Sequence, residues 1–188
     1  MLKLWWWITF HQDDSVPLIR NWVDGQVDGN LVKLIAFSEN SRFSGENNTG
    51  ISAVEADFYL LLNSDTLVRK GAVSTLLESA ISNTEAGLIG PRLEWPDATP
   101  QESCFRFHTS FSQLISSANT GFITNIFKKY NVPYPVSDQL DFYDWTSFAC
   151  VLVRAEVFKE IGLMDDGYFM YFEDVAFAHK AQKAFECA

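Results

Sequence analysis

The sequence is poor in cysteine, and its few cysteines show no regular spacing. Its 188 residues include three, Cys104, Cys150 and Cys187, and no two of them form a CxxC pair. An odd number of cysteines without paired spacing argues against both a disulfide framework and a zinc site. We therefore expect each to be a small buried or half-buried side chain.

Positive charge is also scarce. Fourteen Lys and Arg residues against 24 Asp and Glu residues give a net charge of −10. Such a chain repels phosphate backbones, so no nucleic-acid partner is expected. A nucleotide substrate stays compatible with this charge, because a divalent cation held by carboxylates reverses the local field where a diphosphate would bind.

Long hydrophobic runs are missing. No stretch reaches the roughly 18 apolar residues that a membrane helix needs, and Leu4–Phe10 is short and lacks a signal-peptide cleavage site. We expect a cytoplasmic protein. One segment, Phe111–Lys129, has apolar residues at helical spacing and ends in two lysines. It either packs on the sheet or lies against the inner face of the membrane as a peripheral contact.

Hydrophobic patterning predicts an α/β fold in one domain, residues 1–188. Strands are expected at Leu4–Phe10, Leu31–Ser38, Asp57–Leu62, Leu88–Leu93 and Phe148–Arg154. Helices are expected at Ser15–Asp24, Gly71–Ser82, Phe111–Lys129, Glu156–Ile161 and from about Glu173. A polar loop is expected at Glu39–Asn48, with a short helix after it to about Ala56. Alternating strands and helices favour a mostly parallel sheet with ligands at the carboxyl ends of its strands.

Asn63-Ser64-Asp65 follows the apolar strand Asp57–Leu62 directly. A carboxylate at such a strand end suits Mg²⁺ or Mn²⁺, which would bridge two phosphates. The alternative is a β-turn in which Asp65 bonds its own backbone or caps the next helix. The tripeptide alone leaves both interpretations open.

Aromatic residues lead into a pair of acids near the end of the chain. Tyr168–Phe172 is followed at once by Glu173 and Asp174, at an expected helix start. The helix terminus favours ionised carboxylates, whereas a desolvating aromatic rim would raise the pKa of one of them. This pattern fits a general base, and it equally fits an ordinary acidic first turn under a hydrophobic patch. His179 has poor same-face spacing to Asp174 and is expected on the surface.

Several segments, in this order, resemble the family-2 glycosyltransferases, especially their rhamnosyltransferase-like branch. They include Asn47-Asn48-Thr49-Gly50, Leu60–Thr66, Gly87–Leu93, Asp144-Trp145, and the long stretch Val157–Asp174. Each motif alone is weak, but together they cover nearly all of residues 31–183 in the order of the family.

The resemblance implies a GT-A fold and transfer of a sugar from a nucleotide-diphospho-sugar, by analogy dTDP-rhamnose, to a saccharide or lipid-linked acceptor. It implies Mg²⁺ or Mn²⁺ on Asp65, and Asp174 as the catalytic base of an inverting reaction, with Glu173 beside it. It places Asn47, Asn48, Asn63 and Asp65 on the donor side. Trp145 and Arg92 are assigned to the acceptor side, although Arg92 is also suited to a phosphate contact and equally to a surface ion pair.

The chain departs from the family at several positions. The first nucleotide-binding strand and the C-terminal elements of the family are missing, which implies truncation at both ends. Phe148 and Arg42 each stand where the family has glycine. The run Trp5-Trp6-Trp7, shifted by two bases, would encode Val-Val-Asp, part of a family motif, which suggests a frameshift before about Asp13.

Two other functions stay open. The first is a catalytically inactive family-2 remnant, which acts as a binding module or has no function. Metal-dependent thermal stabilisation by a nucleoside diphosphate would separate an enzyme from such a remnant. The second is a nucleotidyltransferase of similar architecture, which would need a glycine-rich basic loop after its first strand. No such loop is visible.

Overall fold

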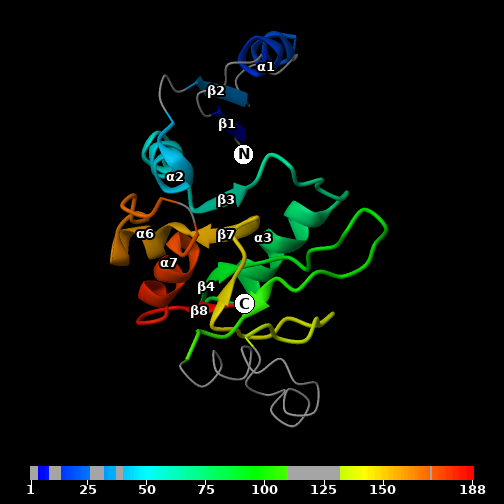
Figure 1. Cartoon of the computed structure of the whole chain (residues 1–188), viewed down its shortest axis with the longest axis vertical. Coiled ribbons are helices and arrows are strands. Elements are labelled where there is room, and N and C mark those ends of the chain that lie inside the picture. Colours follow the sequence, from blue (N-terminus) through cyan, green and yellow to red (C-terminus); the bar gives the residue numbers. More distant parts are fainter. Residues whose placement is uncertain (1–3, 9–13, 26–31, 37–39, 110–131, 170) are drawn as a thin grey trace. The chain divides into compact units, whose positions relative to one another are not determined.

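The computed structural model describes residues 4–8, 14–25, 32–36, 40–109, 132–169 and 171–188. Figure 1 shows their helices and strands, coloured from blue at the N-terminus to red at the C-terminus. The chain divides into two compact units. The first consists of Met1–Ala56 with Leu163–Glu173, and the second of Asp57–Gly162 with Asp174–Ala188. The expectation of one catalytic domain over residues 1–188 stays a prediction.

The first unit is built on a parallel strand pair. Strands β1 (Leu4–Ile8) and β2 (Val32–Ala36) run side by side, with Leu4 opposite Val32. Helix α1 (Ser15–Asp24) connects them and contacts β2. Both strands and the helix were predicted, and the bounds of α1 agree with the expected ones. A parallel pair needs such a crossover, because a tight turn cannot join strands that run in the same direction.

Helix α2 (Arg42–Ser52) corrects the prediction of a loop over Glu39–Asn48. The polar residues of this segment bond to their own helix rather than to a loop. Asn47 Nδ2 donates to the carbonyl of Phe43 at 2.8 Å, and Thr49 Oγ1 donates to that of Gly45 at 2.9 Å. The helix also contacts β1. Packing thus overrides a weak local propensity.

The second unit contains a four-stranded sheet in the order β3-β7-β4-β8. The strands are β3 (Phe58–Leu62), β7 (Cys150–Arg154), β4 (Ala86–Ile89) and β8 (Glu186–Cys187). Strand β7 is antiparallel to both β3 and β4, whereas β4 and β8 are parallel. The α/β class is confirmed, and this sheet is mixed. A buried strand is a continuous apolar run whether it is parallel or antiparallel to its neighbours. The sequence therefore did not show that β7 runs opposite to β3 and β4.

Shorter elements complete the second unit. Helix α3 (Ala72–Ser82) follows β3, α6 (Ala155–Ile161) follows β7, and α7 spans Glu173–Ala181. Strands β5 (Cys104–Phe105) and β6 (Trp145–Thr146) form a small antiparallel pair. The sequence predicted the three helices but not β5, β6 or β8, because two-residue strands carry no periodic signal. Strand β4 ends at Ile89, earlier than predicted, before Gly90-Pro91.

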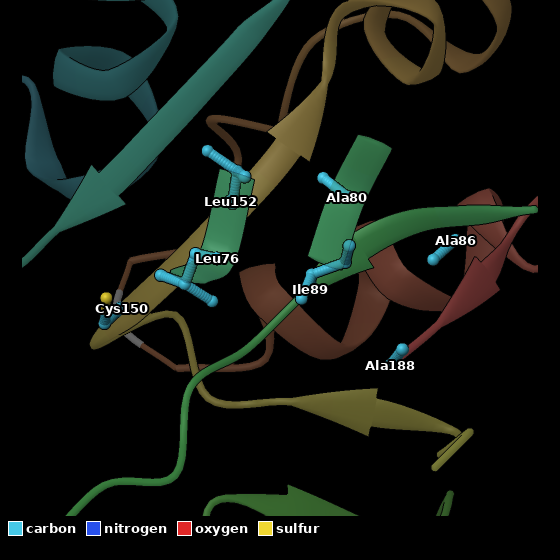
Figure 2. Packing of buried hydrophobic residues seen from close by; sticks show 7 residues of the cluster. All are labelled: Leu76, Ala80, Ala86, Ile89, Cys150, Leu152 and Ala188. Atoms are coloured by element: carbon cyan, nitrogen blue, oxygen red, sulfur yellow. The ribbon is translucent and has the colours of Figure 1, made fainter. Parts of the chain in front are cut away.

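The core of the second unit lies between α3 and one face of the sheet. Figure 2 shows its buried side chains, which come from α3, β4, β7 and the chain end: Leu76, Ala80, Ala86, Ile89, Cys150, Leu152 and Ala188. Val151 and Val153 are fully buried on the opposite face, since side chains alternate along a strand. Burial raises the pKa of Cys150 to about 11 and of Cys187 to about 12. The expectation of buried or half-buried cysteines is confirmed.

Within the described residues, no helix is long and apolar enough to cross a membrane. The segment Phe111–Lys129, for which a helix was predicted, lies outside the described residues. The choice between its sheet-packing and membrane-surface roles therefore stays open.

Candidate active site

The turn Asn63–Thr66 lies at the end of β3 and is closed by its backbone. Thr66 N–H donates to the carbonyl of Asn63 at 3.1 Å, so the predicted β-turn exists. The carbonyl of Ala149 accepts from Asn63 N–H at 2.9 Å and from Thr66 Oγ1 at 3.4 Å. These bonds fasten the turn to the chain just before β7.

The side chain of Asp65 takes no part in closing this turn. It is exposed, and within the described residues its carboxylate accepts no hydrogen bond and forms no ion pair. It does not cap α3 either, because the N-cap residue of that helix is Gly71. The carboxylate is thus available to a ligand, with its backbone held in place.

This arrangement fits a divalent cation that is shared with a substrate. No group of three or more His, Cys, Asp or Glu side chains suited to a metal occurs in the described part of the chain. Mg²⁺ typically uses one or two protein carboxylates together with substrate phosphates and water. Asp65 supplies one such carboxylate, so a cation here would depend on a bound diphosphate for further ligands.

The acidic pair Glu173-Asp174 opens helix α7, as predicted. Asp174 Oδ1 accepts a hydrogen bond from Val175 N–H at 2.8 Å, which fixes the carboxylate against the first turn. Glu173 Oε2 is buried and has no hydrogen-bond partner among the described residues. Each side chain is half-buried. A buried carboxylate oxygen without a donor is costly, so this atom stores an unfavourable energy at the start of α7.

The aromatic residues that precede this pair are exposed to solvent rather than desolvating. Phe169, Tyr171 and Phe172 are 73%, 72% and 61% exposed. The expected aromatic rim around the acids is therefore wrong for these three side chains. Tyr171 and Phe172 have φ values of 67° and 68°, in the left-handed region that non-glycine residues rarely adopt. Sequence patterns do not indicate this backbone, because neither position is a glycine.

An aromatic cluster holds α7 in the second unit. The Phe177 ring lies 5.3 Å from that of Phe158 and 6.0 Å from that of Phe148. Phe148, one of the departures from the family, is only 3% exposed and fills the space beside α7. Because Phe148 precedes Ala149, the same short segment contacts both α7 and the turn that carries Asp65.

Trp145 lies in β6 and is held on both its face and its edge. Its ring stacks on Phe105 with centroids 4.4 Å apart, and Nε1 donates to the carbonyl of Arg106 at 3.2 Å. The neighbouring Asp144 accepts from Phe107 N–H at 2.8 Å. Gln182, just beyond α7, donates to the carbonyl of Asp144 at 3.0 Å. The acceptor role of Trp145 stays a prediction.

Arg92 forms the surface ion pairs that the sequence left open as an alternative. Its guanidinium pairs with Glu94 and with Asp138, and Glu94 also pairs with Arg69. The hydrogen bond to Glu94 is the main reason that the pKa of Arg92 is raised. A contact of Arg92 with an acceptor would have to compete with these carboxylates.

In the first unit, Asn47 and Asn48 are engaged with the protein. Asn47 is buried and bonds within α2. Asn48 Nδ2 donates to the carbonyl of Met164 at 2.8 Å, and Met164 N–H donates back to Asn48 Oδ1 at 3.0 Å. Asn48 thus attaches the segment after α6 to helix α2. The donor contact expected of both residues stays a prediction.

The sequence missed the role of residues 147–149. Ser147 N–H donates to the carbonyl of Ser103 at 2.8 Å, and Ala149 bonds the Asp65 turn. The substitution of phenylalanine for glycine at position 148 was the one visible signal. The surface position expected for His179 is confirmed, and its ring meets Phe107 edge-on at 5.1 Å.

Comparison with known proteins identifies the family of the chain. Residues 10–162 match the sequence profile of Glycosyl transferase family 2. The chain is 28% identical over 137 residues to the N-acetylglucosaminyl-diphospho-decaprenol L-rhamnosyltransferase of Mycobacterium tuberculosis, covering 68% of this chain and 42% of that protein. It is 27% identical over 150 residues to the low-salt glycan biosynthesis hexosyltransferase Agl10 of Haloferax volcanii, covering 77% of this chain and 44% of that protein.

A solved structure supports the same fold. The mannosyltransferase PcManGT from Pyrobaculum calidifontis, in complex with GDP-Man and Mn²⁺, superposes with a TM-score of 0.63 at 10% identity, covering 99% of this chain and 44% of that one. The GT-A fold implied by the sequence resemblance is thereby confirmed. The chain belongs to glycosyltransferase family 2. It spans less than half the length of the relatives named above.

Proposed function

We propose that this protein transfers a sugar from a nucleotide-diphospho-sugar to a saccharide or lipid-linked acceptor, in the cytoplasm and with Mg²⁺ or Mn²⁺. Membership of family 2 and relatives named as rhamnosyl- and hexosyltransferases support the class of reaction. The rhamnosyltransferase relative favours rhamnose as the transferred sugar, with dTDP-rhamnose as the donor by analogy. The mannosyltransferase that contains Mn²⁺ supports use of a divalent cation.

One observation carries the proposal. The turn with Asp65 and the helix with Asp174 both attach to residues 148–149 of the second unit. Ala149 bonds the turn, and Phe148 packs on Phe177, one turn into α7 from Asp174. A transferase needs groups for the leaving phosphate and for the attacking hydroxyl that are fixed relative to each other. The common attachment to residues 148–149 supports a role for Asp65 at the leaving phosphate and for Asp174 at the attacking hydroxyl.

The chemistry follows from the two carboxylates. Asp174 takes the proton of the acceptor hydroxyl, and the oxygen forms a new bond to the anomeric carbon. The bond from that carbon to the diphosphate breaks, and its electron pair leaves with the nucleoside diphosphate. A single displacement of this kind inverts the anomeric configuration. A divalent cation on Asp65 would supply stabilisation of the negative charge on the leaving group.

The remaining residues bind and orient. Glu173, beside Asp174, orients the acceptor or accepts a backbone hydrogen bond. Asn63 and Asp65 serve the donor side from the β3 turn, and Asn47 and Asn48 serve it from α2. Trp145 serves the acceptor side. Asn48 also has a positioning role, since its amide holds the backbone of Met164 nine residues before Glu173.

Thermal unfolding of the chain with nucleoside diphosphates tests this proposal. UDP or dTDP should raise the unfolding temperature in the presence of Mn²⁺ and lose that effect when EDTA is added. A ligand at about 100 times its Kd stabilises a protein by about 2.7 kcal/mol. No stabilisation by any nucleoside diphosphate with Mn²⁺ would instead indicate an inactive family-2 remnant.

A further inference from the structure

The carboxylate of Glu94 lies between two arginines from different parts of the second unit. Its Oε1 accepts two hydrogen bonds from Arg92, the one from Nε at 3.1 Å, and its Oε2 forms an ion pair with Arg69. Arg92 follows β4 and Arg69 follows β3, so the carboxylate connects two segments that are distant in the sequence. Its side chain is only 15% exposed. Neither Glu94 nor Arg69 has a role in the site described so far.

Glu94 is held on a backbone hairpin formed by residues 93–101. Its neighbour Trp95 donates its backbone N–H to the carbonyl of Thr99 at 2.8 Å. Glu94 itself lies opposite Pro100 in an antiparallel β-bridge. Backbone hydrogen bonds across the hairpin fix the place from which the Glu94 side chain extends. Glu94 can therefore serve as a fixed point for a more loosely held segment.

Arg69 belongs to such a segment, the exposed stretch between the Asp65 turn and α3. Leu67 is 89% exposed and Val68 is also exposed, so burial of apolar side chains does little to hold this stretch. Among the described residues, the contact of Arg69 with Glu94 is the one ion pair or side-chain hydrogen bond of residues 67–70. The position of the stretch thus depends on this contact.

The segment that carries Asp65 is consequently attached on both sides of the carboxylate. Ala149 holds it before Asp65 by accepting from Asn63 N–H at 2.9 Å, and Glu94 holds it four residues after Asp65 through Arg69. Fixing a segment in this way removes conformations that a ligand would otherwise have to suppress when it binds. The attachment by Glu94 therefore helps to preorganise the carboxylate of Asp65.

Charge makes Glu94 unsuited to contact the donor directly. A diphosphate is anionic, and a carboxylate close to it would repel it. Removing the charge of Glu94 would thus strengthen the binding of an anion if charge were its only influence. Loss of a contact that positions Asp65 would instead weaken that binding. The two roles predict changes of opposite sign.

We propose that Glu94 is a positioning residue for the donor side of the site. Through its ion pair with Arg69 it holds the segment that carries Asp65 in the arrangement that receives the metal and the diphosphate. The proposal rests on the proposed function, because it assumes that Asp65 serves the donor. Glu94 acts at a distance, through Arg69, and touches neither the donor nor the metal.

Isothermal titration of the 188-residue chain with dTDP at saturating Mn²⁺ tests the proposal. The variants are Glu94→Gln, Arg69→Met and the two substitutions combined. Glutamine keeps an acceptor for Arg92, and Arg69 is exposed, so both variants should keep the fold. The matched control is Lys70→Met, because Lys70 is the adjacent exposed cation and has no ion pair among the described residues.

We expect Glu94→Gln and Arg69→Met each to raise the Kd of dTDP by about three- to tenfold, the usual effect of one further side chain that must be ordered on binding. The combined variant should raise it no further than either substitution alone, because the two side chains act as one pair. Lys70→Met should bind dTDP almost as the unmodified chain does.

A purely electrostatic influence gives a different pattern. Glu94→Gln would then leave the Kd of dTDP unchanged or lower it, and Lys70→Met would weaken binding as much as Arg69→Met does. Either result, or additive effects in the combined variant, would overturn the inference while the proposed function stands. Absence of binding of both dTDP and UDP to the unmodified chain would overturn the proposed function, and the inference with it.

Discussion

At the scale of single residues, Asp65 and Asn48 show two different uses of polar side chains from the predicted site. The carboxylate of Asp65 is exposed and has no partner within the described residues, while its backbone is fixed by Ala149. Asn48 has its amide satisfied twice by the backbone of Met164. The first residue is available to a ligand, and the second stabilises the segment that leads to the acids.

Asp65→Asn should abolish the Mn²⁺-dependent stabilisation by a nucleoside diphosphate and leave the unfolding temperature of the free protein unchanged. The reason is that the substitution removes an exposed charge without removing a contact of the fold. Thermal unfolding with and without Mn²⁺–dTDP measures both effects. Glu78→Gln, an exposed acid on α3, is the control and should bind as the unmodified chain does. Unchanged metal-dependent stabilisation in Asp65→Asn would show that Asp65 does not hold the metal.

Arg42 explains one of the departures from the family. Its φ is 62°, in the left-handed region, and this is the position where the family has glycine. Its guanidinium lies 4.8 Å from the ring centre of Phe169. The chain thus has a non-glycine residue in a conformation that favours glycine, with its cation over an exposed ring.

The pair Arg42→Gly and Arg42→Val isolates the backbone effect, because both substitutions remove the cation. A residue with Cβ in this conformation costs about 1–2 kcal/mol, so the glycine variant should be the more stable by about that amount. This reverses the usual order, in which glycine is the less stable residue in a helix. Urea unfolding measures the difference. A valine variant as stable as the glycine variant would contradict the left-handed conformation at position 42.

At the scale of elements, the contact between Gly90 and Thr146 joins the end of β4 to β6. The two segments approach so closely that no side chain fits at position 90. Thr146 is 1% exposed and donates from Oγ1 to the carbonyl of Ser103 at 3.1 Å. The junction therefore fixes the start of the segment that leads to Ala149.

Gly90→Ala should destabilise the protein by about 1–3 kcal/mol, the usual cost of overpacking a tight contact. In the background Thr146→Ala the cost should fall, because the nearest atom, Thr146 Oγ1, is then absent. Gly25→Ala is the matched control, since its nearest neighbours would lie at 3.5 Å and its φ is −83°. Equal costs of Gly90→Ala in both backgrounds, measured by urea unfolding, would argue against the close approach of Gly90 to Thr146.

An element could be predicted from the sequence where its hydrophobic periodicity was strong or its ends were marked by proline or glycine. The bounds of α1 agreed with expectation because Pro17 and Gly25 mark its ends. Helix α2 was mistaken for a loop because its glycine and polar residues have a weak helix propensity, which its packing against β1 overrides. The direction of β7 and the two-residue strands depend on long connections, which local patterns do not encode. Within the site, the acids were proposed from motif order, whereas the contacts of Phe148 and Ala149 with α7 and with the Asp65 turn became visible only in the structure.

At the scale of the whole molecule, family membership and the anchored acids lead to one central claim, which is that the protein is a metal-assisted glycosyltransferase with Asp174 as its base. The match to the family spans residues 10–162, and Asp174 lies beyond it. Its assignment therefore rests on motif order, on its position at the start of α7 and on the contacts of that helix. Adjacent residues on a helix point about 100° apart, so Glu173 and Asp174 cannot both face the acceptor hydroxyl squarely.

The most direct test of this claim is the rate of sugar transfer from a panel of nucleotide-sugars in Mn²⁺, for the unmodified chain, Asp174→Asn and Glu173→Gln. We predict transfer from one donor, a loss of about 10²–10⁴-fold in Asp174→Asn, and a smaller loss in Glu173→Gln. Stabilisation by Mn²⁺ with the nucleoside diphosphate should be unchanged in both variants, since the base acts on the acceptor. A larger loss in Glu173→Gln, full activity in Asp174→Asn, or no transfer from any donor by the unmodified chain would contradict the claim.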